Sequence, residues 1–277
     1  MECTECGSTG WRTRSDDGMR RVERCGCWRR KLEQALLAEA GIPPRYQKCS
    51  FSTFITYPNE KLRRVLARAR AFAAAFPVVD KGLLLIGRPG IGKTHLAVAT
   101  LREVVVGKGA RALYFDTRTL LSTIRSTFNP VTRASEADVL GRVMGAELLV
   151  LDDLGAERTT DWVADTMNLI VNTRYNDRRP TIFTSNYEDA DDESDLDSLR
   201  VRVGFRMHSR LREMCEFLQY DGPDFREFDF KPGADDLLQR WRAQPGGKLP
   251  RRTRSLARAQ LQDGRLELPW EGGKAGG

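Results

Sequence analysis

Short apolar runs alternate with amphipathic stretches along most of the chain. The clearest apolar runs lie at residues 83–86, 112–115, 148–151 and 181–184. Such short, continuous runs are typical of strands buried on both faces in a parallel sheet. The helical stretches between them predict an α/β fold in which helices flank a parallel sheet. A fifth run, residues 214–220, fits a strand nearly as well as the end of a helix.

Two helices are predicted before the first of these strands. Residues 31–40 form a short amphipathic pattern that ends at Gly41, a typical helix stop. Asn59 is a candidate N-cap for a second helix, which should run to about Phe76 and end at the following proline.

Composition divides the chain into three parts. Four of the six cysteines stand close to the N-terminus, and the C-terminal end is rich in Gly, Pro and Arg. The latter composition predicts a disordered basic tail, because it offers little apolar surface to bury. We expect a head of residues 1–45, a core domain of residues 46–243 and a tail of residues 244–277.

The charge and the apolar runs bound the class of protein. The formal net charge is +7, and a basic balance favours polyanionic partners such as nucleic acid. No apolar run approaches the roughly 18 residues of a membrane span, and the N-terminus lacks the pattern of a signal peptide. We therefore predict a cytoplasmic protein with no membrane partner, in which cysteines do not form a disulfide framework.

A phosphate-binding loop follows the first apolar run. The sequence GRPGIGKT, residues 87–94, fits G-x-x-x-x-G-K-[ST] between a strand and a helix. The glycines let backbone N–H groups turn toward phosphate oxygens, and the helix adds its positive N-terminal end. Lys93 should meet the β- and γ-phosphates, and the Thr94 hydroxyl should bind Mg²⁺. The predicted nucleotide-binding residues are Gly87, Arg88, Pro89, Gly90, Ile91, Gly92, Lys93, Thr94 and His95.

Two further strands end in side chains suited to hydrolysis of a nucleoside triphosphate. The run LLVLDD ends in Asp152, a candidate Mg²⁺ ligand, and Asp153, which is placed to polarise a water molecule. The run PTIFTSN ends in Asn186, which can orient that water; the alternative is a turn-forming residue at a strand end. Together these strand ends favour hydrolysis over phosphate transfer to a metabolite.

These motifs together resemble the DnaC/IstB family of AAA+ ATPases. The matching stretches, from about residue 41 to residue 226, are GIPPRYQKCSFSTF, GRPGIGKTHLA, LLVLDDLGAE, NTRY, PTIFTSN and RMHSRLREMCEFLQYDGPDFR. The resemblance implies a P-loop NTPase sheet of the AAA+ type that binds ATP. It also implies self-association in a spiral or hexamer-like assembly, which loads a replicative helicase of the DnaB type onto single-stranded DNA.

The resemblance assigns roles to the polar residues. Residues 87–94 become the Walker A motif, Asp152 and Asp153 the Walker B pair, and Asn186 the sensor-1 residue. An aspartate pair is usual in this family. Because aspartate is one methylene shorter than glutamate, Asp153 should hold its base farther from the γ-phosphate. Slow hydrolysis is the expected result, and it suits a switch whose ATP-bound form must persist.

The resemblance also assigns two arginines. Arg210 aligns with the arginine finger that reaches the γ-phosphate of the neighbouring subunit, with Arg206 one helical turn away as the alternative. Arg226 matches the sensor-2 arginine, which contacts phosphates within its own chain. The acidic segment 187–204 departs from the family pattern, and we interpret it as a solvated loop. It leaves the choice between Arg206 and Arg210 open.

The N-terminal cysteines predict a metal site. Cys3, Cys6, Cys25 and Cys27 stand in a C-x₂-C and C-x-C arrangement that can give a tetrahedral zinc site with four sulfur ligands. The alternative is a reduced, disordered head. Because helicase loaders of the family often begin with a similar cysteine head, the resemblance implies that residues 1–45 bind the helicase.

The segment TRTLLSTIRSTFNPVTR is the part of the family module that faces the central channel and meets single-stranded DNA. By that resemblance Arg118, Arg125 and Arg133 could follow phosphates, and Phe128 could stack on a base. The alternative is an ordinary amphipathic helix in which Phe128 is buried.

Two other functions fit part of this pattern. An IstB-type ATPase that assists a transposase on duplex DNA would share the ATPase module, but such helpers usually carry a different N-terminal region. A P-loop nucleoside or nucleotide kinase would need an acceptor pocket and lid arginines, and the sequence offers no sign of them. A helicase loader that uses ATP, Mg²⁺ and Zn²⁺ is therefore the leading prediction.

Overall fold

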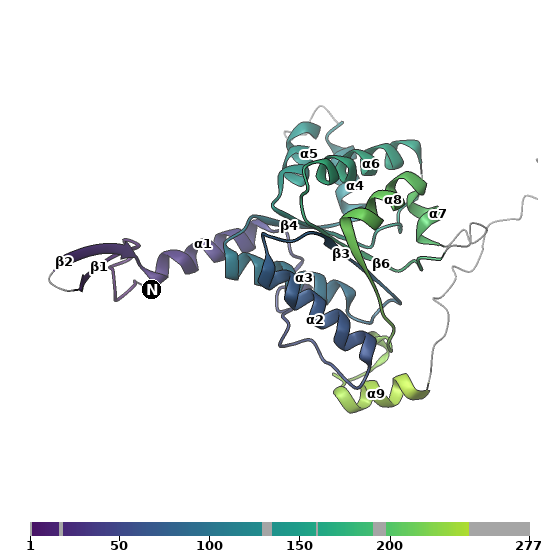
Figure 1. Cartoon of the computed structure of the whole chain (residues 1–277), viewed down its shortest axis with the longest axis horizontal. Helices are drawn as coiled ribbons and strands as arrows, with labels where there is room; N and C mark the ends of the chain where they lie inside the picture. The colour runs from purple at the N-terminus through teal and green to yellow at the C-terminus, as the bar shows by residue number, and fades with distance from the viewer. Residues whose placement is uncertain (1, 17–18, 129–134, 159, 191–197, 244–277) are drawn as a thin grey trace, which may run out of the picture.

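A five-stranded parallel sheet forms the centre of the molecule (Figure 1). The computed structural model describes residues 2–16, 19–128, 135–158, 160–190 and 198–243. Across the sheet the strand order is β4-β5-β6-β3-β7. The five strands are β3 (Gly82–Ile86), β4 (Ala112–Asp116), β5 (Leu148–Asp152), β6 (Thr181–Ser185) and β7 (Cys215–Gln219).

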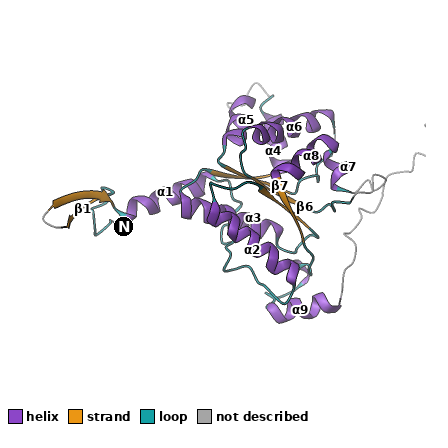
Figure 2. Cartoon of the chain, in the orientation of Figure 1, coloured by secondary structure: helices purple, strands orange, loops and turns teal. Residues whose placement is uncertain are grey.

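The sheet separates two apolar layers, because successive side chains of a strand point to opposite faces. On β3, Leu83 and Leu85 pack in one layer and Leu84 and Ile86 in the other. Helices cover both faces (Figure 2), so every residue of β3, β5 and β6 is buried. The first layer is covered by α2 (Glu60–Ala75) and α3 (Lys93–Lys108), and the second by α4 (Thr117–Ser126), α5 (Glu136–Gly145), α6 (Asp161–Asn176), α7 (Leu199–Val203) and α8 (Phe205–Met214).

The structure confirms the predicted α/β fold. The four predicted strands are present, each within one residue of its expected ends, and the ambiguous run 214–220 is an edge strand, β7. Asn59 caps α2 as predicted, because its side chain accepts a hydrogen bond from the Leu62 N–H at 3.2 Å. The same side chain donates to the Asp221 carbonyl oxygen at 2.9 Å, which ties the start of α2 to the segment after β7.

The head differs from the prediction in its secondary structure. It contains an antiparallel hairpin, β1 (Trp11–Asp16) and β2 (Met19–Arg24), and α1 (Gly26–Glu39), which begins earlier than the expected residue 31. The hairpin lies at the N-terminal end of α1 and projects away from the body of the molecule (Figure 1). It is nearly all exposed, so it shows no alternation of apolar and polar residues from which strands could have been predicted.

Arg174, within the stretch NTRY, is a buried structural residue rather than a site residue. Only 1% of it is exposed. Its guanidinium caps the C-terminal end of α5 and connects α6 to the residues just before β5 and β6. It therefore stabilises the edge of the sheet at which these two strands begin. It donates hydrogen bonds to the carbonyl oxygens of Val143, Met144, Ala146 and Pro180 and to the Thr181 hydroxyl.

The described chain ends in α9 (Ala234–Ala243), which the sequence did not predict. Leu237 of α9 is buried, and the Trp241 ring lies 6.0 Å from that of Tyr57. The η1 turn (Pro44–Tyr46) and the η2 turn (Phe225–Glu227) complete the fold. The predicted tail, residues 244–277, lies outside the described residues, and the division into head, core domain and tail stays a prediction. Within the described part of the chain, no helix is long and apolar enough to cross a membrane.

Candidate active site

The phosphate loop lies between β3 and α3, as the sequence predicted. Gly90 and Gly92 have φ angles of +78° and +94°, a conformation that side chains with a Cβ rarely adopt. Neighbouring side chains also exclude a Cβ: one on Gly90 would lie 1.6 Å from an Asp224 oxygen, and one on Gly92 would lie 2.7 Å from the Phe54 ring. The glycines therefore serve both the turn of the loop and its close contact with two other segments.

Lys93 lies buried at the centre of the site. Its Nζ donates to the carbonyl oxygens of Gly87 at 2.8 Å and Arg88 at 2.7 Å, and to Oδ1 of Asn186 at 2.7 Å. Burial lowers the pKa of Lys93 to about 8, although the charges of Asp152 and Asp153 act in the opposite direction. When a nucleotide binds, phosphate oxygens would take the place of the two carbonyl oxygens as hydrogen-bond acceptors for Lys93.

The Asp152 carboxylate accepts hydrogen bonds from three hydroxyl groups. These come from Thr94 at 3.0 and 3.1 Å, Tyr114 at 2.7 Å and Thr184 at 2.6 Å. Tyr114 and Thr184 belong to β4 and β6, the two strands beside β5, and sequence reasoning missed both. Burial, followed by the Asp152 charge, raises the pKa of Tyr114, so this hydroxyl stays a donor. The pairing of Thr94 with Asp152 fits the oxygen donors that Mg²⁺ prefers.

Asn186 joins Lys93 to Asp153. Its Oδ1 accepts from Lys93, and its Nδ2 donates to Oδ1 of Asp153 at 2.5 Å. Because an ammonium only donates and a carboxylate only accepts, these partners determine which way the amide points. Burial, followed by the neighbouring Asp152, raises the pKa of Asp153. The structure thus brings the predicted loop lysine, acid pair and strand-end asparagine into one network.

A cavity of about 700 Å³ opens beside this network. Its lining combines the phosphate loop, the Walker B pair and Asn186 with aromatic and aliphatic side chains, including Phe54, Ile55 and Tyr57. A lining with both charged and apolar groups fits a ligand that has a phosphate chain and a base. Among mixed pockets of this kind, such volumes are typical of small-ligand sites.

The segment after β7 packs directly against the phosphate loop. The Phe225 N–H donates to the Gly90 carbonyl oxygen at 3.1 Å. Asp224 accepts from the Arg226 N–H at 2.8 Å, and Arg226 lines the cavity. Arg226 therefore lies in the wall of the cavity beside the phosphate loop, and its sensor-2 role stays a prediction.

His95 lines the same cavity but is tied to the segment before α2. Its Nε2 lies 2.9 Å from the Ser50 carbonyl oxygen and 3.2 Å from the Thr53 hydroxyl. Its ring meets that of Phe54 edge to face, and burial lowers the pKa of His95. His95 thus fixes the wall of the cavity, and its contact with a nucleotide stays a prediction.

The two candidate arginine fingers lie on α8 and do not line the cavity of their own chain, as far as the described residues show. Arg206 is exposed and Arg210 half-buried, and Arg210 Nη1 donates to the Arg206 carbonyl oxygen at 3.1 Å. The arginine-finger role of either residue stays a prediction.

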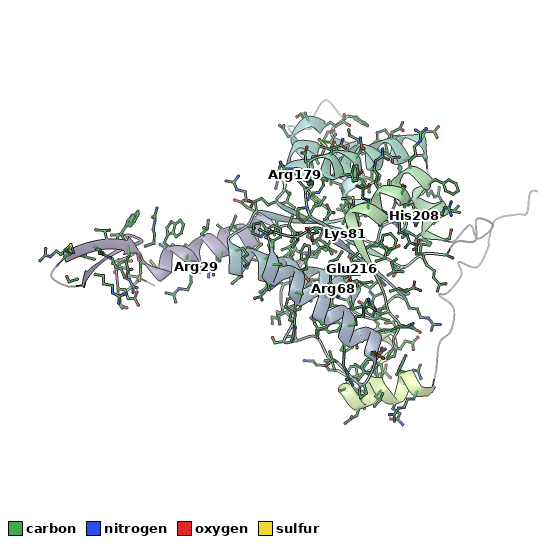
Figure 3. The ribbon with its side chains drawn as sticks, in the orientation of Figure 1. Arg29, Arg68, Lys81, Arg179, His208 and Glu216 are labelled. Carbon is green, nitrogen blue, oxygen red and sulfur yellow. The ribbon has the colours of Figure 1, made fainter. Side chains whose placement is uncertain are left out.

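The acidic segment before α8 is only partly a solvated loop. The Asp189 side chain is 8% exposed and pairs with His208 at 2.6 Å and with Arg212. His208 lies on α8 (Figure 3), so this segment is anchored to the helix that carries the candidate fingers. Residues 191–197 lie outside the described residues.

The predicted DNA-contact residues have different surroundings. Arg118 donates to the Ala156 carbonyl oxygen. The Arg125 guanidinium lies 4.7 Å from the centroid of the Trp162 ring, and the Phe128 ring meets the same tryptophan edge to face at 6.1 Å. Phe128 is 54% exposed, so the alternative interpretation of a buried Phe128 is wrong. Arg133 lies outside the described residues.

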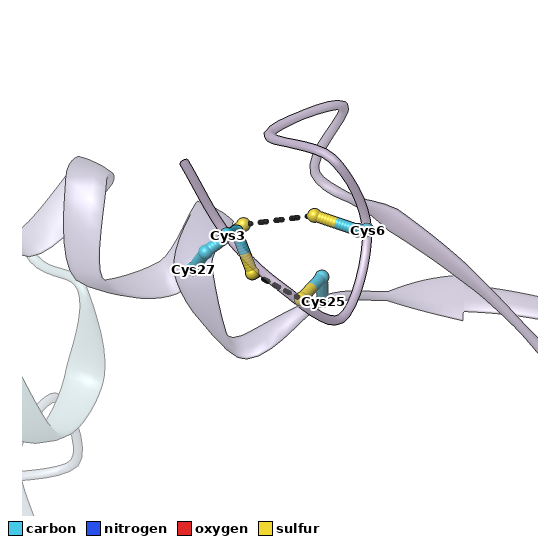
Figure 4. Close-up of side chains that lie close together, drawn as sticks. All are labelled: Cys3, Cys6, Cys25 and Cys27. Carbon is cyan, nitrogen blue, oxygen red and sulfur yellow. Dashed lines mark hydrogen bonds between the residues drawn. The ribbon is translucent and has the colours of Figure 1, made fainter. Parts of the chain in front are cut away.

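The four N-terminal cysteines come together in one cluster (Figure 4). All four sulfur atoms lie within 4.8 Å of one another; the Cys3–Cys25 and Cys6–Cys27 pairs are 3.7 and 3.2 Å apart. Tetrahedral zinc with bonds of about 2.3 Å requires sulfur separations of about 3.8 Å. The donor set and its spacing therefore fit zinc.

The fold and the site together define a P-loop NTPase of the AAA+ class. The phosphate loop follows β3, the acid pair follows β5 and the polar residue follows β6, so all three meet at the carboxyl edge of the parallel sheet. This edge is where open α/β sheets bind ligands.

Comparisons with known proteins give the family. The sequence profile of the IstB-like ATP binding proteins matches residues 30–227, and the chain belongs to this DnaC/IstB family of AAA+ ATPases. The replicative helicase loader DnaC of Escherichia coli K12 is 27% identical over 179 residues, which cover 65% of this chain and 69% of that protein.

Two further comparisons show how much of the chain is similar to known proteins. An uncharacterized Bacillus subtilis protein, YqaM, is 26% identical over 209 residues, 72% of this chain, and the chain spans 64% of that relative. A crystal structure of the DnaC helicase loader is 35% identical, with a TM-score of 0.57; the match covers 64% of this chain and 99% of that one. The predicted family is confirmed.

Proposed function

We propose that this chain is an ATPase switch that loads a replicative helicase of the DnaB type onto single-stranded DNA. The observation that carries the ATPase part is the hydrogen-bonded network of Lys93, Asn186 and Asp153 beside a cavity with a phosphate loop. The loader part is supported by the similarity to DnaC and by the projecting cysteine head, which the family resemblance relates to helicase binding.

In this proposal each residue of the network has one task. Lys93 exchanges its two carbonyl partners for phosphate oxygens of ATP. Asn186 orients the attacking water, and Asp153 accepts its proton; a raised pKa makes that carboxylate a better base. Thr94 and Asp152 would hold Mg²⁺, which neutralises phosphate charge when bound.

ATP turnover measured with different DNA molecules tests the function. We expect single-stranded DNA to stimulate turnover, and we expect the chain with ATP to place the DnaB-type helicase of its host on a forked DNA substrate, measured as unwinding. Duplex DNA as the stimulating form, with no helicase loading, would instead support the alternative function, an IstB-like helper of a transposase. A phosphorylated small-molecule product would identify a kinase and contradict both.

We also propose that the cysteine cluster binds zinc. Purified chain should carry about one zinc ion, and Cys25→Ser should release it, because a structural zinc site needs all four ligands. The Cys25→Ser variant should bind the helicase weakly but retain ATP affinity, since none of the four clustered cysteines lines the cavity. Cys215→Ala is the matched control: its thiol lies in the core of the body, so zinc should remain. Metal analysis that finds no zinc in fresh, reduced wild-type protein would contradict the site.

A further inference from the structure

Arginine side chains hold three successive backbone carbonyl groups just after the Walker B pair. Arg202 donates to the Gly155 oxygen through Nε at 2.8 Å and Nη2 at 2.7 Å, and through Nη2 to the Glu157 oxygen at 2.7 Å. Arg118 donates to the Ala156 oxygen between them through Nε at 3.1 Å and Nη2 at 2.5 Å. Because this loop runs outside the sheet, the two guanidinium groups supply the donors that a neighbouring strand would otherwise give.

The loop begins at Asp153, whose backbone has an unusual conformation. Its φ is +61°, in the left-handed region, and such residues persist where their surroundings hold them there. On one side, the Asp153 N–H donates to the Thr184 hydroxyl at 2.9 Å and the Leu154 N–H to the Thr184 carbonyl oxygen at 2.8 Å. On the other side, the Leu154 carbonyl oxygen accepts from the Ser185 hydroxyl at 2.9 Å, and Arg202 holds the next carbonyl group, that of Gly155. Asp153 is thus held in its conformation from both directions.

Arg202 is itself held in place by the sensor-1 segment. Its guanidinium lies 5.0 Å from the centroid of the Tyr187 ring, and Tyr187 follows Asn186 directly. A Cβ on Gly155 would lie 3.2 Å from the same ring, so the ring, the guanidinium and the loop pack together. Arg202 therefore connects the loop after Asp153 to the residue next to Asn186, the partner of the Asp153 carboxylate.

We propose that Arg202 is a positioning residue for ATP hydrolysis: it holds residues 154–157 so that the Asp153 carboxylate stays against Asn186, and Arg118 supports the same loop from α4. The inference rests on the proposed ATPase function. Arg202 does not line the cavity, so the proposal separates it from residues that bind the nucleotide.

The test compares Arg202→Ala and Arg202→Lys with wild type in steady-state turnover without DNA. Arg202→Ala should lower kcat by about 10- to 100-fold, the range for residues that orient the groups of a reactive site without contacting the ligand. The affinity for ATP should stay unchanged. The kcat of Arg202→Lys should lie between those of wild type and Arg202→Ala, because an ammonium cannot reproduce the forked hydrogen bonds of a guanidinium. Arg200→Ala is the control: it lies on the same helix, near the Phe205 ring, and should keep the wild-type kcat.

Hydrogen exchange separates positioning from a general loss of structure. In Arg202→Ala, amides of residues 153–157 should exchange faster, while those of β5 should exchange as in wild type. A double variant with Arg118→Ala should lose less than the sum of the two single losses in activation free energy, because both arginines act on one loop. Wild-type kcat in Arg202→Ala would overturn the inference, as would parallel loss of kcat, ATP affinity and melting temperature. Wild-type chain that binds ATP without turning it over would overturn the proposed ATPase function as well.

Discussion

Lys93→Ala is expected to abolish ATP binding, whereas Asp153→Asn should bind ATP normally and fail to turn it over. Lys93 is the buried cation that faces the phosphate loop, and its removal leaves the Gly87 and Arg88 carbonyl oxygens turned toward the phosphate site without a compensating charge. Hydrogen bonds to charged groups contribute about 1.5–3 kcal/mol each, and phosphate oxygens would lose several.

Asp153→Asn changes the chemistry of one side chain and little else. Asparagine adopts the left-handed conformation at φ +61° as readily as aspartate, and it keeps an oxygen for the Asn186 amide. It is a far weaker base, so turnover should fall by roughly 10²- to 10⁴-fold, the contribution of a positioned general base. Binding of a fluorescent ATP analogue and release of phosphate measure the two effects separately.

Two exposed residues serve as matched controls for these variants. Lys108 lies at the other end of α3 and Asp165 on the outer side of α6, and both are exposed. Lys108→Ala and Asp165→Asn should leave binding and turnover unchanged. Equal loss of ATP binding in Lys93→Ala and Asp153→Asn would contradict the role proposed for Asp153, because a base that acts only on water contributes little to the affinity for ATP.

The core of the candidate site could be predicted because strand ends of a parallel sheet meet at one edge. Asp152 is the last residue of β5 and Asp153 follows it. Asn186 follows β6, the neighbour of β5, and the loop that leads to Lys93 follows β3, on the other side of β6. The acids and the asparagine come at the ends of short strand-like runs, and the G-x-x-x-x-G-K-[ST] motif places Lys93, so local patterns were enough. Phe54, in the wall of the cavity, entered the sequence analysis only as part of the stretch GIPPRYQKCSFSTF, which resembles the family.

Residues that hold the site residues in place could not be predicted, because their roles depend on contacts between segments that lie far apart in the sequence. Tyr114 and Thr184 hold Asp152 only because β4 and β6 lie on either side of β5. Arg202 lies in a segment whose acidic composition indicated a solvated loop. Arg174 belongs to the stretch NTRY, which resembles the family but gave no sign of a structural role. The hairpin of the head escaped prediction because its strands are exposed and show no alternation of apolar and polar residues.

Arg210→Ala is expected to bind ATP with near-normal affinity and to lose turnover by roughly 10³-fold or more, the range for arginines that act in trans in related phosphoryl transfer. Arg210 does not line the cavity of its own chain, so binding should not depend on it. The exposed Arg64 on α2, which lies on the opposite face of the sheet from α8 (Figure 1), provides the control. Arg64→Ala should turn over ATP as wild type does.

Mixing two inactive variants decides whether Arg210 acts across an interface. Arg210→Ala chains keep an intact cavity, and Lys93→Ala chains keep an intact Arg210, so an interface between them can combine both. Partial recovery of ATP turnover on mixing, at concentrations where chains assemble on single-stranded DNA, is the expected result. Recovery with Arg206→Ala but not with Arg210→Ala would assign the finger to Arg206, one turn away on α8. If neither substitution changes turnover, neighbouring chains do not share an active site, and each chain hydrolyses ATP with the residues of its own cavity.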